Sequence, residues 1–333
     1  MTGIRSSPSV PTQAGLVRVM VVGAGDISRF VHLPALKQNP NATIVGIAAR
    51  TRARLAKLAA DFAVDNYDTS WQRLLAATNP DLVVVATPNA SHFEVAIGCL
   101  RHGAHVLLEK PGVLSTDEGQ ILLEEAAAHG REVRVNLTLR LLPAVQRLQS
   151  LITTRLQPSD VAYEIRYYIS KPAQDWYKDV VSAGGGLIFT VGTHALDLIS
   201  YISGQPILGV DSGMVGGSAD EARLAITLHD GSRAVALLGW NARGLSLSLT
   251  AKSARGEARL HLGPGDASSL HFDAQPILTD SLWDKLVTYS SCNLFVDRIL
   301  NGSSVEALPD LAEHMQVLAP IFAIQRSENR WHA

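Results

Sequence analysis

The sequence has little cysteine and no excess of charge of either sign. Cys99 and Cys292 are its two cysteines, and they lie far apart without metal-ligand spacing. This argues against a disulfide framework and a metal site, and it favours a reducing, cytoplasmic compartment. The 29 Lys and Arg residues nearly balance the 31 Asp and Glu residues. A nucleic-acid-binding surface, which needs a clustered positive field, is therefore not expected.

Long hydrophobic runs are also missing. The most apolar stretch, from Leu187 to Ile202, contains His194 and Asp197, and it is shorter than the roughly 20 residues that a membrane span needs. Residues 1–15 are rich in Ser, Pro, Thr and Gly and contain no apolar segment, so they are predicted to be a disordered tail rather than a signal peptide. What the sequence does have is 47% hydrophobic residues in a chain of 333. This is enough for two domains of about 150 residues each.

Residues 16–137 alternate short apolar runs with amphipathic segments. The apolar runs are Val17–Val22, Ile44–Ala48, Leu82–Ala86, His105–Leu108 and Val133–Leu137, and the helix-like segments between them are Ser28–Gln38, Arg52–Phe62, Ser70–Ala77, Ser91–Leu100 and Thr116–His129. Near-continuous apolar strands separated by helices are typical of a parallel sheet covered on both faces. We therefore predict an α/β Rossmann domain with a doubly wound parallel sheet.

Residues 138–333 follow a different pattern. Strand-like runs come one after another at Val161–Ile169, Ile207–Met214, Ala222–Leu228, Ala234–Leu238, Leu245–Thr250 and Ala258–Leu262. Consecutive strands without helices between them indicate an antiparallel or mixed sheet. Helices are predicted at Ala144–Thr153, His194–Ile202, Ser281–Leu300 and Pro309–Ile324. The second half is thus predicted to be an α+β domain with a large, mostly antiparallel sheet.

A glycine-rich turn directly follows the first predicted strand. Residues 23–28 read Gly-Ala-Gly-Asp-Ile-Ser, which matches the dinucleotide-binding fingerprint G-x-G-x-x-G except at Ser28. Gly23 permits the tight turn, and Gly25 lets a pyrophosphate approach the backbone at a helix N-terminus. A small serine is tolerated at the third position, which requires only close packing. The alternative is a glycine-rich turn without a ligand.

The end of the second predicted strand bears on the choice of cofactor. NAD-binding units normally carry an Asp or Glu there that binds the ribose. This chain instead has Ala49, Arg50 and Thr51, followed by Arg52 and Arg54. Cations at a helix start are electrostatically disfavoured, and a bound 2′-phosphate would explain them. NADP(H) is therefore the predicted cofactor, with NAD(H) as the alternative, and an ordinary solvated arginine face is the competing interpretation.

Four further motifs occur in order along the chain. They are Thr-Pro-Asn-Ala-Ser-His at 87–92, Glu-Lys-Pro at 109–111, Gly-Gly-Gly at 184–186 and Gly-Thr-His-Ala-Leu-Asp at 192–197. Together with the phosphate loop they resemble the glucose–fructose oxidoreductase / inositol dehydrogenase (Gfo/Idh/MocA) family. The resemblance covers nearly the whole chain after the tail. The Glu-Lys-Pro tripeptide alone is common, but the ordered set is specific.

The resemblance implies which residues border the cofactor and the substrate. The implied cofactor-binding residues are Gly23, Gly25, Ile27, Ser28, Thr87, Pro88, Asn89, His92, Glu109 and Lys110. From their places in the sequence, Asp26, Ala49, Arg50, Thr51, Arg54 and Asn136 are added as cofactor-binding candidates. The candidate substrate-binding residues are Lys110, Arg140, Trp176, Tyr177, Thr190, His194 and Asp197. Lys110 and His194 match the family's catalytic lysine and histidine. Many family dehydrogenases carry an aspartate four residues before that histidine, where this chain has Thr190.

Each of these residues also has a purely structural interpretation. Hydride transfer from a carbinol needs a proton acceptor, and a buried lysine at a strand's carboxyl end suits that role, but Lys110 alone could be a surface charge. Asp197 orients His194 or satisfies buried backbone groups. Trp176 and Tyr177 stack on a sugar ring or pack a lid, and His92 is either a ligand or only a helix-start residue.

The predicted function is that of an NADP(H)-dependent oxidoreductase, a ketoreductase or dehydrogenase. It would transfer hydride between nicotinamide and a carbinol or ketone of a sugar, cyclitol or nucleotide-linked keto-sugar. The alternative is a non-catalytic cofactor-binding regulator of the same fold, which the departure at Thr190 favours and the Lys110 and His194 pair opposes. By analogy with the family, the second domain also forms a homodimer or homotetramer, and no membrane partner is expected.

Overall fold

A computed structural model describes residues 15–156, 158–171, 186–214, 220–263, 267–281 and 290–329. The chain divides into two compact units, which are considered separately below. The first contains the residues up to Asn136 and a later segment that ends at Ala312, and the second contains the rest. The predicted tail, residues 1–15, lies outside the described residues except for Gly15.

The first unit is built on a six-stranded parallel sheet with the order β3-β2-β1-β4-β5-β6. Its strands are β1 (Val17–Val22), β2 (Ala42–Ala48), β3 (Tyr67–Asp68), β4 (Leu82–Val85), β5 (His105–Glu109) and β6 (Val133–Asn136). Its helices are α1 (Leu33–Gln38), α2 (Arg52–Asp61), α3 (Trp71–Thr78), α4 (His92–Arg101), α5 (Thr116–Ala128) and α11 (Ser291–Asn301). This strand order is that of a Rossmann fold, which confirms the predicted class; the short β3 was not predicted.

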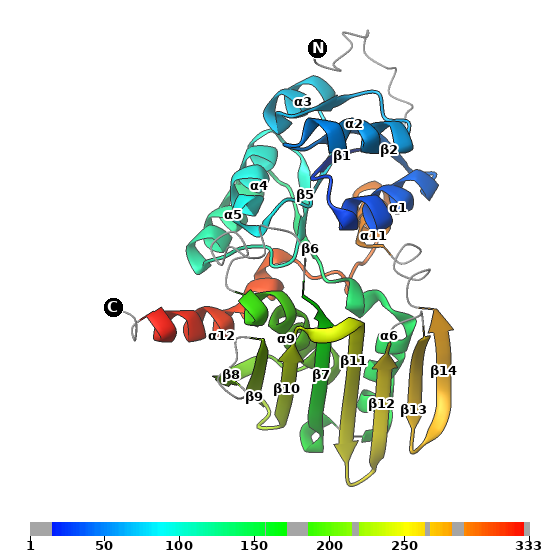
Figure 1. Cartoon of the computed structure of the whole chain (residues 1–333), viewed down its shortest axis with the longest axis vertical. Helices are drawn as coiled ribbons and strands as arrows, with labels where there is room; N and C mark the ends of the chain where they lie inside the picture. Colours follow the sequence, from blue (N-terminus) through cyan, green and yellow to red (C-terminus); the bar gives the residue numbers. More distant parts are fainter. Residues whose placement is uncertain are drawn as a thin grey trace. The chain divides into compact units, whose positions relative to one another are not determined.

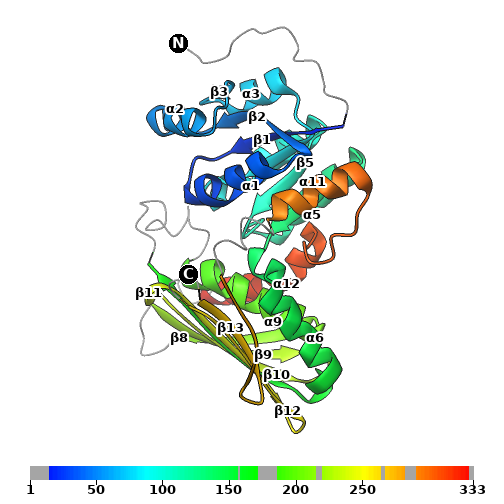
Figure 2. The ribbon, with the colours of Figure 1, turned by 90° about the vertical axis from the view of Figure 1, so that its right-hand side faces the viewer.

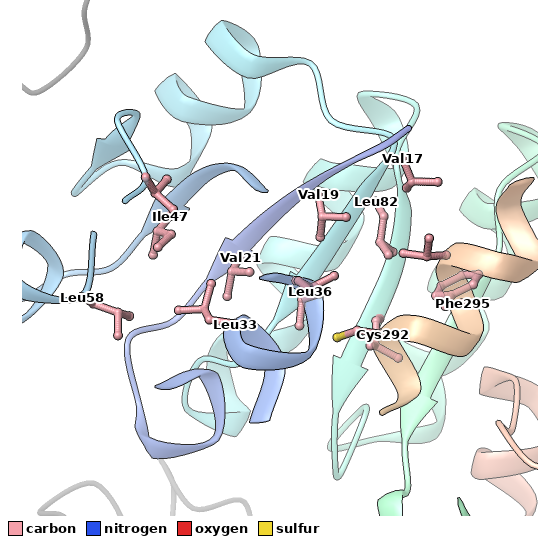
Figure 3. Close-up of a cluster of buried hydrophobic side chains, with 14 of the residues drawn as sticks. Val17, Val19, Val21, Leu33, Leu36, Ile47, Leu58, Leu82, Cys292 and Phe295 are labelled. Carbon is pink, nitrogen blue, oxygen red and sulfur yellow. The ribbon is translucent and has the colours of Figure 1, made fainter. Parts of the chain in front are cut away.

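One face of this sheet carries the main hydrophobic cluster (Figure 3). Alternate residues of β1 point into it, namely Val17, Val19 and Val21, because successive strand side chains point to opposite faces. Helices α1, α2 and α11 cover this face with Leu33, Leu36, Leu55, Leu58, Cys292, Phe295 and Val296. Figure 1 shows α11 beside α1, although more than 250 residues separate them in the chain.

The placement of α11 differs from the sequence analysis, which assigned everything after residue 137 to the second domain. Helix α11 packs on the first unit through Phe295, whose ring lies edge-on to His105 at 5.8 Å, and through Arg298, which donates to Glu132 at 3.1 Å. The expected start of this helix at Ser281 is also wrong. Strand β14 runs through Ser281, and α11 begins at Ser291 with Ser290 as its N-cap.

The second unit is built on an eight-stranded sheet with the order β14-β13-β12-β11-β7-β10-β9-β8. Its strands are β7 (Ala162–Ser170), β8 (Ile207–Met214), β9 (Glu221–Leu228), β10 (Arg233–Gly239), β11 (Asn241–Ser253), β12 (Gly256–Leu262), β13 (Ala267–Phe272) and β14 (Gln275–Ser281). Only the pairing of β10 with β7 is parallel among the described strands. The predicted mostly antiparallel α+β domain is thus confirmed.

Helices cover one face of this second sheet (Figure 2). They are α6 (Pro143–Leu151), α9 (Thr193–Ser203) and α12 (Leu311–Asn329), which belongs to this unit from Glu313 onward. On β7, Tyr163, Ile165 and Tyr167 are buried while Glu164 and Arg166 are exposed, so the strand alternates as a sheet with one covered face requires. The sequence analysis did not predict β13 and β14, the two strands at one edge of this sheet.

Candidate active site

The phosphate loop joins β1 to the first helix of the first unit. Gly23 has a φ of +125°, and a Cβ there would lie 2.1 Å from the carbonyl oxygen of Ala86, so only glycine fits where the ends of β1 and β4 approach. At Gly25, by contrast, a Cβ would meet no described atom within 4 Å. The open side of Gly25 is where a pyrophosphate could approach the backbone.

Two hydroxyl groups near this loop are buried without a partner. Neither Ser28 Oγ nor Thr87 Oγ1 has a hydrogen-bond partner among the described residues. Ser28 lies in the first turn after the loop, and Thr87 follows β4, the neighbour of β1. An unpaired buried hydroxyl costs free energy, and a bound dinucleotide would supply acceptors for both. The other loop residues, Asp26 and Ile27, are exposed and half-buried.

Arginines gather just beyond β2. Arg50, Thr51 and Arg54 are exposed, and Ala49 is half-buried. No carboxylate follows β2 before Asp61, the last residue of α2. The end of β2 therefore presents positive charge where NAD-specific units present an acid.

The His92 side chain bridges two loops at the carboxyl end of the sheet. Its Nδ1 lies 2.9 Å from the carbonyl oxygen of Pro111, and its Nε2 lies 3.0 Å from that of Thr87. The side chain is fully buried, and burial lowers its pKa against the opposing effect of the two carbonyls. Both ring nitrogens are thus engaged by the protein, an arrangement unlike the cofactor contact expected for His92. Pro88 and Asn89, which follow Thr87, form the turn that leads into α4.

Glu109, at the end of β5, is held from two sides. His32 Nε2 lies 2.8 Å from Glu109 Oε1, and Asn136 Nδ2 donates to the same oxygen at 2.5 Å. Burial raises the pKa of Glu109, but His32, Asn136 and Lys110 outweigh this and hold it below its usual range. The carboxylate is therefore ionised. It also accepts from the backbone N–H of Lys110 at 3.3 Å.

Lys110 is the first residue after β5. Its side chain is half-buried, and burial lowers its pKa below the ordinary lysine value of 10.5, while the charge of Glu109 acts in the opposite direction. Because its pKa is lowered, Lys110 releases its proton more readily than an exposed lysine does.

In the second unit, Arg140 and Asp197 form a buried ion pair. Arg140 Nε donates to both oxygens of Asp197 at 3.0 and 2.9 Å, and Nη2 donates to Oδ1 at 2.5 Å. Nη1 donates to Glu313 of α12, and the guanidinium lies 4.9 Å from the ring centroid of Tyr201. Both members of the pair are 1% exposed. The structure thus joins two of the expected substrate-binding residues to each other.

His194 lies on the first turn of α9 and is only half-buried, whereas its neighbours Thr193 and Ala195 are fully buried. Its ring packs edge-on against Tyr167 of β7 at 5.9 Å. Thr190 is buried one helical turn earlier, in a segment (Ile188–Gly192) that runs directly into α9. Trp176 and Tyr177 lie outside the described residues.

Three residues of the site were not found from the sequence: His32, Ser291 and Cys292. His32 Nδ1 lies 3.2 Å from Cys292 Sγ, and Ser291 Oγ donates to Asn136 Oδ1 at 2.5 Å. Residues 32 and 292 are 260 positions apart, so no local pattern connects them. The one signal in the sequence was His32 itself, a histidine among apolar residues at the start of a helix.

Two other features bear on function. Within the described ranges, no helix is long and apolar enough to cross a membrane. The described part of the chain also contains no group of three or more His, Cys, Asp or Glu side chains placed to hold a metal ion.

Known proteins resemble this chain in sequence and in fold. Residues 17–137 match the family described as "Oxidoreductase family, NAD-binding Rossmann fold". A 1,5-anhydro-D-fructose reductase from Ensifer adhaerens is 24% identical over 305 residues, which cover 79% of this chain and 91% of the relative. Over residues 17–137 the chain thus matches the Gfo/Idh/MocA oxidoreductase family. The structure of GenD2 from gentamicin A biosynthesis, solved in complex with NAD, shares the fold with a TM-score of 0.83 at 24% identity, covering 96% of each chain.

Other relatives match this chain over only part of their own length. Oxidoreductase P35 from Formosa agariphila is 26% identical over 192 residues, which cover 56% of this chain and 60% of that protein. The D-glucoside 3-dehydrogenase of Escherichia coli K12 is 24% identical over 192 residues, which cover 57% of this chain and 55% of that protein. The resemblance predicted from the ordered motifs is supported over residues 17–137.

Proposed function

We propose that this protein is an NADP(H)-dependent oxidoreductase that interconverts a carbinol and a ketone of a sugar-type compound. The observation that carries the proposal is Lys110, a half-buried lysine with a lowered pKa at the carboxyl end of a Rossmann strand. In doubly wound sheets, ligands bind at the carboxyl ends of the strands. A regulator that only bound a dinucleotide would have no need of such a group.

The residues present fit a dinucleotide. The bare backbone at Gly25 and the unpaired hydroxyls of Ser28 and Thr87 would hold the phosphates and neighbouring polar groups. The arginines after β2, above all Arg50, would bind a 2′-phosphate by charge-assisted hydrogen bonds. When bound, the cofactor supplies or accepts a hydride. NADP(H) is the proposed preference, because no carboxylate follows β2 to hold a free ribose hydroxyl.

Lys110 is proposed as the main proton donor in the reductive direction and as the acceptor in the oxidative one. In reduction, its Nζ would give a proton to the oxygen that becomes the hydroxyl. His194 is proposed to orient the sugar oxygen or share the proton. Because Thr190 carries no negative charge, nothing at that position would stabilise an imidazolium. His194 is therefore proposed to work mostly in its neutral form.

The substrate class rests on the relatives. Both the 1,5-anhydro-D-fructose reductase and the D-glucoside 3-dehydrogenase act on sugars by name, and a sugar, cyclitol or nucleotide-linked keto-sugar is proposed here. The proposed substrate-binding residues still include Trp176 and Tyr177. Arg140 and Asp197 are proposed to support the substrate site by holding α9. A homodimer or homotetramer in the cytoplasm is proposed from the family resemblance.

The test is an NADPH fluorescence titration followed by turnover measurements on a panel of keto-sugars and the matching sugars. Tight NADPH binding with turnover of at least one sugar supports the proposal. NADPH binding without turnover of any of them, and with no effect of Lys110→Ala, would instead support a non-catalytic cofactor-binding protein.

A further inference from the structure

Next to Lys110, four buried side chains and the half-buried Glu109 form a ring that is closed by the chain bond between Ser291 and Cys292. Cys292 Sγ touches His32 Nδ1, His32 Nε2 touches Glu109, Glu109 accepts from Asn136, and Asn136 accepts from Ser291, the chain neighbour of Cys292. The four members other than Glu109 are at most 2% exposed, and the side chain of Glu109 is 13% exposed. The ring joins α11 to the end of β5, at the residue next to Lys110.

We propose that this ring sets the charge balance of Lys110, with His32 and Cys292 as positioning residues for the reaction. The inference rests on the proposed function, since it assigns a task to the surroundings of the proposed catalytic lysine. It goes beyond that function by assigning His32, before α1, and Cys292, on α11, a role that acts through Glu109.

His32 is the positively charged member of the ring. Burial lowers its pKa, but the neighbouring Cys292 and Glu109 outweigh burial and raise it from 6.5 to about 10. His32 is therefore an imidazolium at neutral pH, and it donates one N–H to Glu109 and the other toward Cys292 Sγ. A cation thus lies 2.8 Å from the carboxylate that adjoins Lys110.

The charge on His32 bears on the pKa of Lys110. An uncompensated carboxylate beside a lysine stabilises the ammonium form and makes the proton harder to release. Burial lowers the pKa of Lys110 and the charge of Glu109 raises it. In this proposal the cation at His32, which contacts Glu109, offsets the carboxylate's charge and so favours the lowered pKa. Among the described groups, Glu109 and Glu118 of α5 also act on His92, whose pKa burial lowers.

The experiment measures Lys110 without relying on turnover. Full-length protein is labelled with acetic anhydride across a pH series, and the labelled fraction of Lys110 is read by peptide mass spectrometry, with exposed Lys57 as the internal reference. His32→Gln keeps a donor for Glu109 but removes the charge. We expect Lys110 to label about threefold or more slowly at pH 8 in this variant, because its titration moves to higher pH.

Cysteine variants separate a positioning role from mere packing. Cys292→Ala removes the acceptor of His32 Nδ1 and is expected to shift Lys110 in the same direction by a smaller amount, whereas Cys292→Ser keeps an acceptor and restores the wild-type profile. Cys99→Ala is the matched control. Cys99 lies on α4, is equally buried and forms none of the ring's contacts. It should lower thermal stability in the same way as Cys292→Ala without shifting Lys110.

An unchanged Lys110 profile in a folded His32→Gln variant overturns the inference, and so does an equal shift in Cys292→Ala and Cys99→Ala. Folding is checked by the melting temperature of each variant. If His32→Gln does not fold, the comparison of Cys292→Ala with Cys292→Ser decides the question, and equal Lys110 profiles in those two variants overturn the inference. Failure of the proposed function would look different. It would appear as wild-type protein that turns over no sugar, or as Lys110→Ala with full turnover, and neither result depends on the labelling data.

Discussion

The Asp197 carboxylate accepts three hydrogen bonds from Arg140 and lies three residues after His194 on the same helix. The sequence left open whether Asp197 orients the histidine or satisfies other buried groups. Its two oxygens are bound to the guanidinium, so the pair ties α9 to the segment before α6. The Asp197 carboxylate thus holds the helix on which His194 lies.

We expect Asp197→Asn to lower the free energy of unfolding by about 3–5 kcal/mol, because it leaves the buried Arg140 cation poorly compensated. Urea denaturation of the full chain, followed by circular dichroism, measures this loss. The control is Glu164→Gln, which removes the partner of Arg166 on the exposed face of β7, where both side chains are about half exposed. An exposed pair contributes about 0–1 kcal/mol. Equal losses in the two variants would contradict the role given to Arg140 and Asp197.

The two glycines of the phosphate loop should respond differently to alanine. Gly23→Ala places a Cβ against Ala86 and strains a positive φ. We expect a loss of about 3 kcal/mol or more, which corresponds to a fall in Tm of roughly 10 °C. Gly25→Ala meets no described atom within 4 Å and should keep the Tm of the cofactor-free protein, but NADPH binding should be lost. Thermal melts with and without NADPH distinguish the two, and a Gly25→Ala variant that binds NADPH normally would contradict the placement of the pyrophosphate.

Arg50→Asp should reverse the cofactor preference. A charge-assisted contact with the 2′-phosphate contributes about 1.5–3 kcal/mol, so we expect NADPH affinity to fall roughly 10–100-fold while NADH affinity rises. Calorimetry with both cofactors measures this. Lys57→Asp, an equal change of charge at an exposed position on α2, serves as the control and should leave the ratio unchanged. Equal NAD(H) and NADP(H) affinities in the wild-type protein would refute the preference.

Lys110→Ala should lower kcat by about 100-fold or more, the usual scale for losing a general acid, with little change in NADPH affinity. The pH profile follows from the lowered pKa of Lys110. Reduction needs the protonated form, which is lost as the pH rises, so kcat/KM for ketone reduction should fall on the alkaline side at a pH below 10.5, the ordinary value for lysine. Oxidation should show the opposite slope. His194→Ala should cost less in kcat and more in KM.

The fold was predictable because its strands carry strong local signals. The run Leu-Val-Val-Val of β4 is apolar throughout, as a strand buried on both faces must be. Strands β13 and β14 were not recognised because Ser268, His271 and Pro276 interrupt the alternation. A helix was predicted where α11 lies. Its amphipathic pattern shows that one face is buried but does not show which sheet that face covers.

The site was predictable only where short motifs carry it. Gly23 and Lys110 directly follow strands of one parallel sheet, and Thr87 follows another after one residue, so their proximity is a consequence of the fold. The contact of His32 with Cys292 has no such basis, because it depends on how a distant helix docks. The roles of Arg140 and Asp197 were open for the same reason, since a charged residue in an apolar segment does not reveal its partner.

The return of α11 to the first unit has a consequence for biosynthesis. A chain emerging from the ribosome presents all six strands of the Rossmann sheet once residue 136 has appeared. The face that carries Val17, Val19 and Val21 is covered only in part, by α1 and α2, until Phe295 and its neighbours follow. At about 5–20 residues per second, this wait lasts roughly ten seconds or more. During that interval the nascent nucleotide-binding unit exposes apolar surface, which makes it a candidate for chaperone binding before synthesis ends.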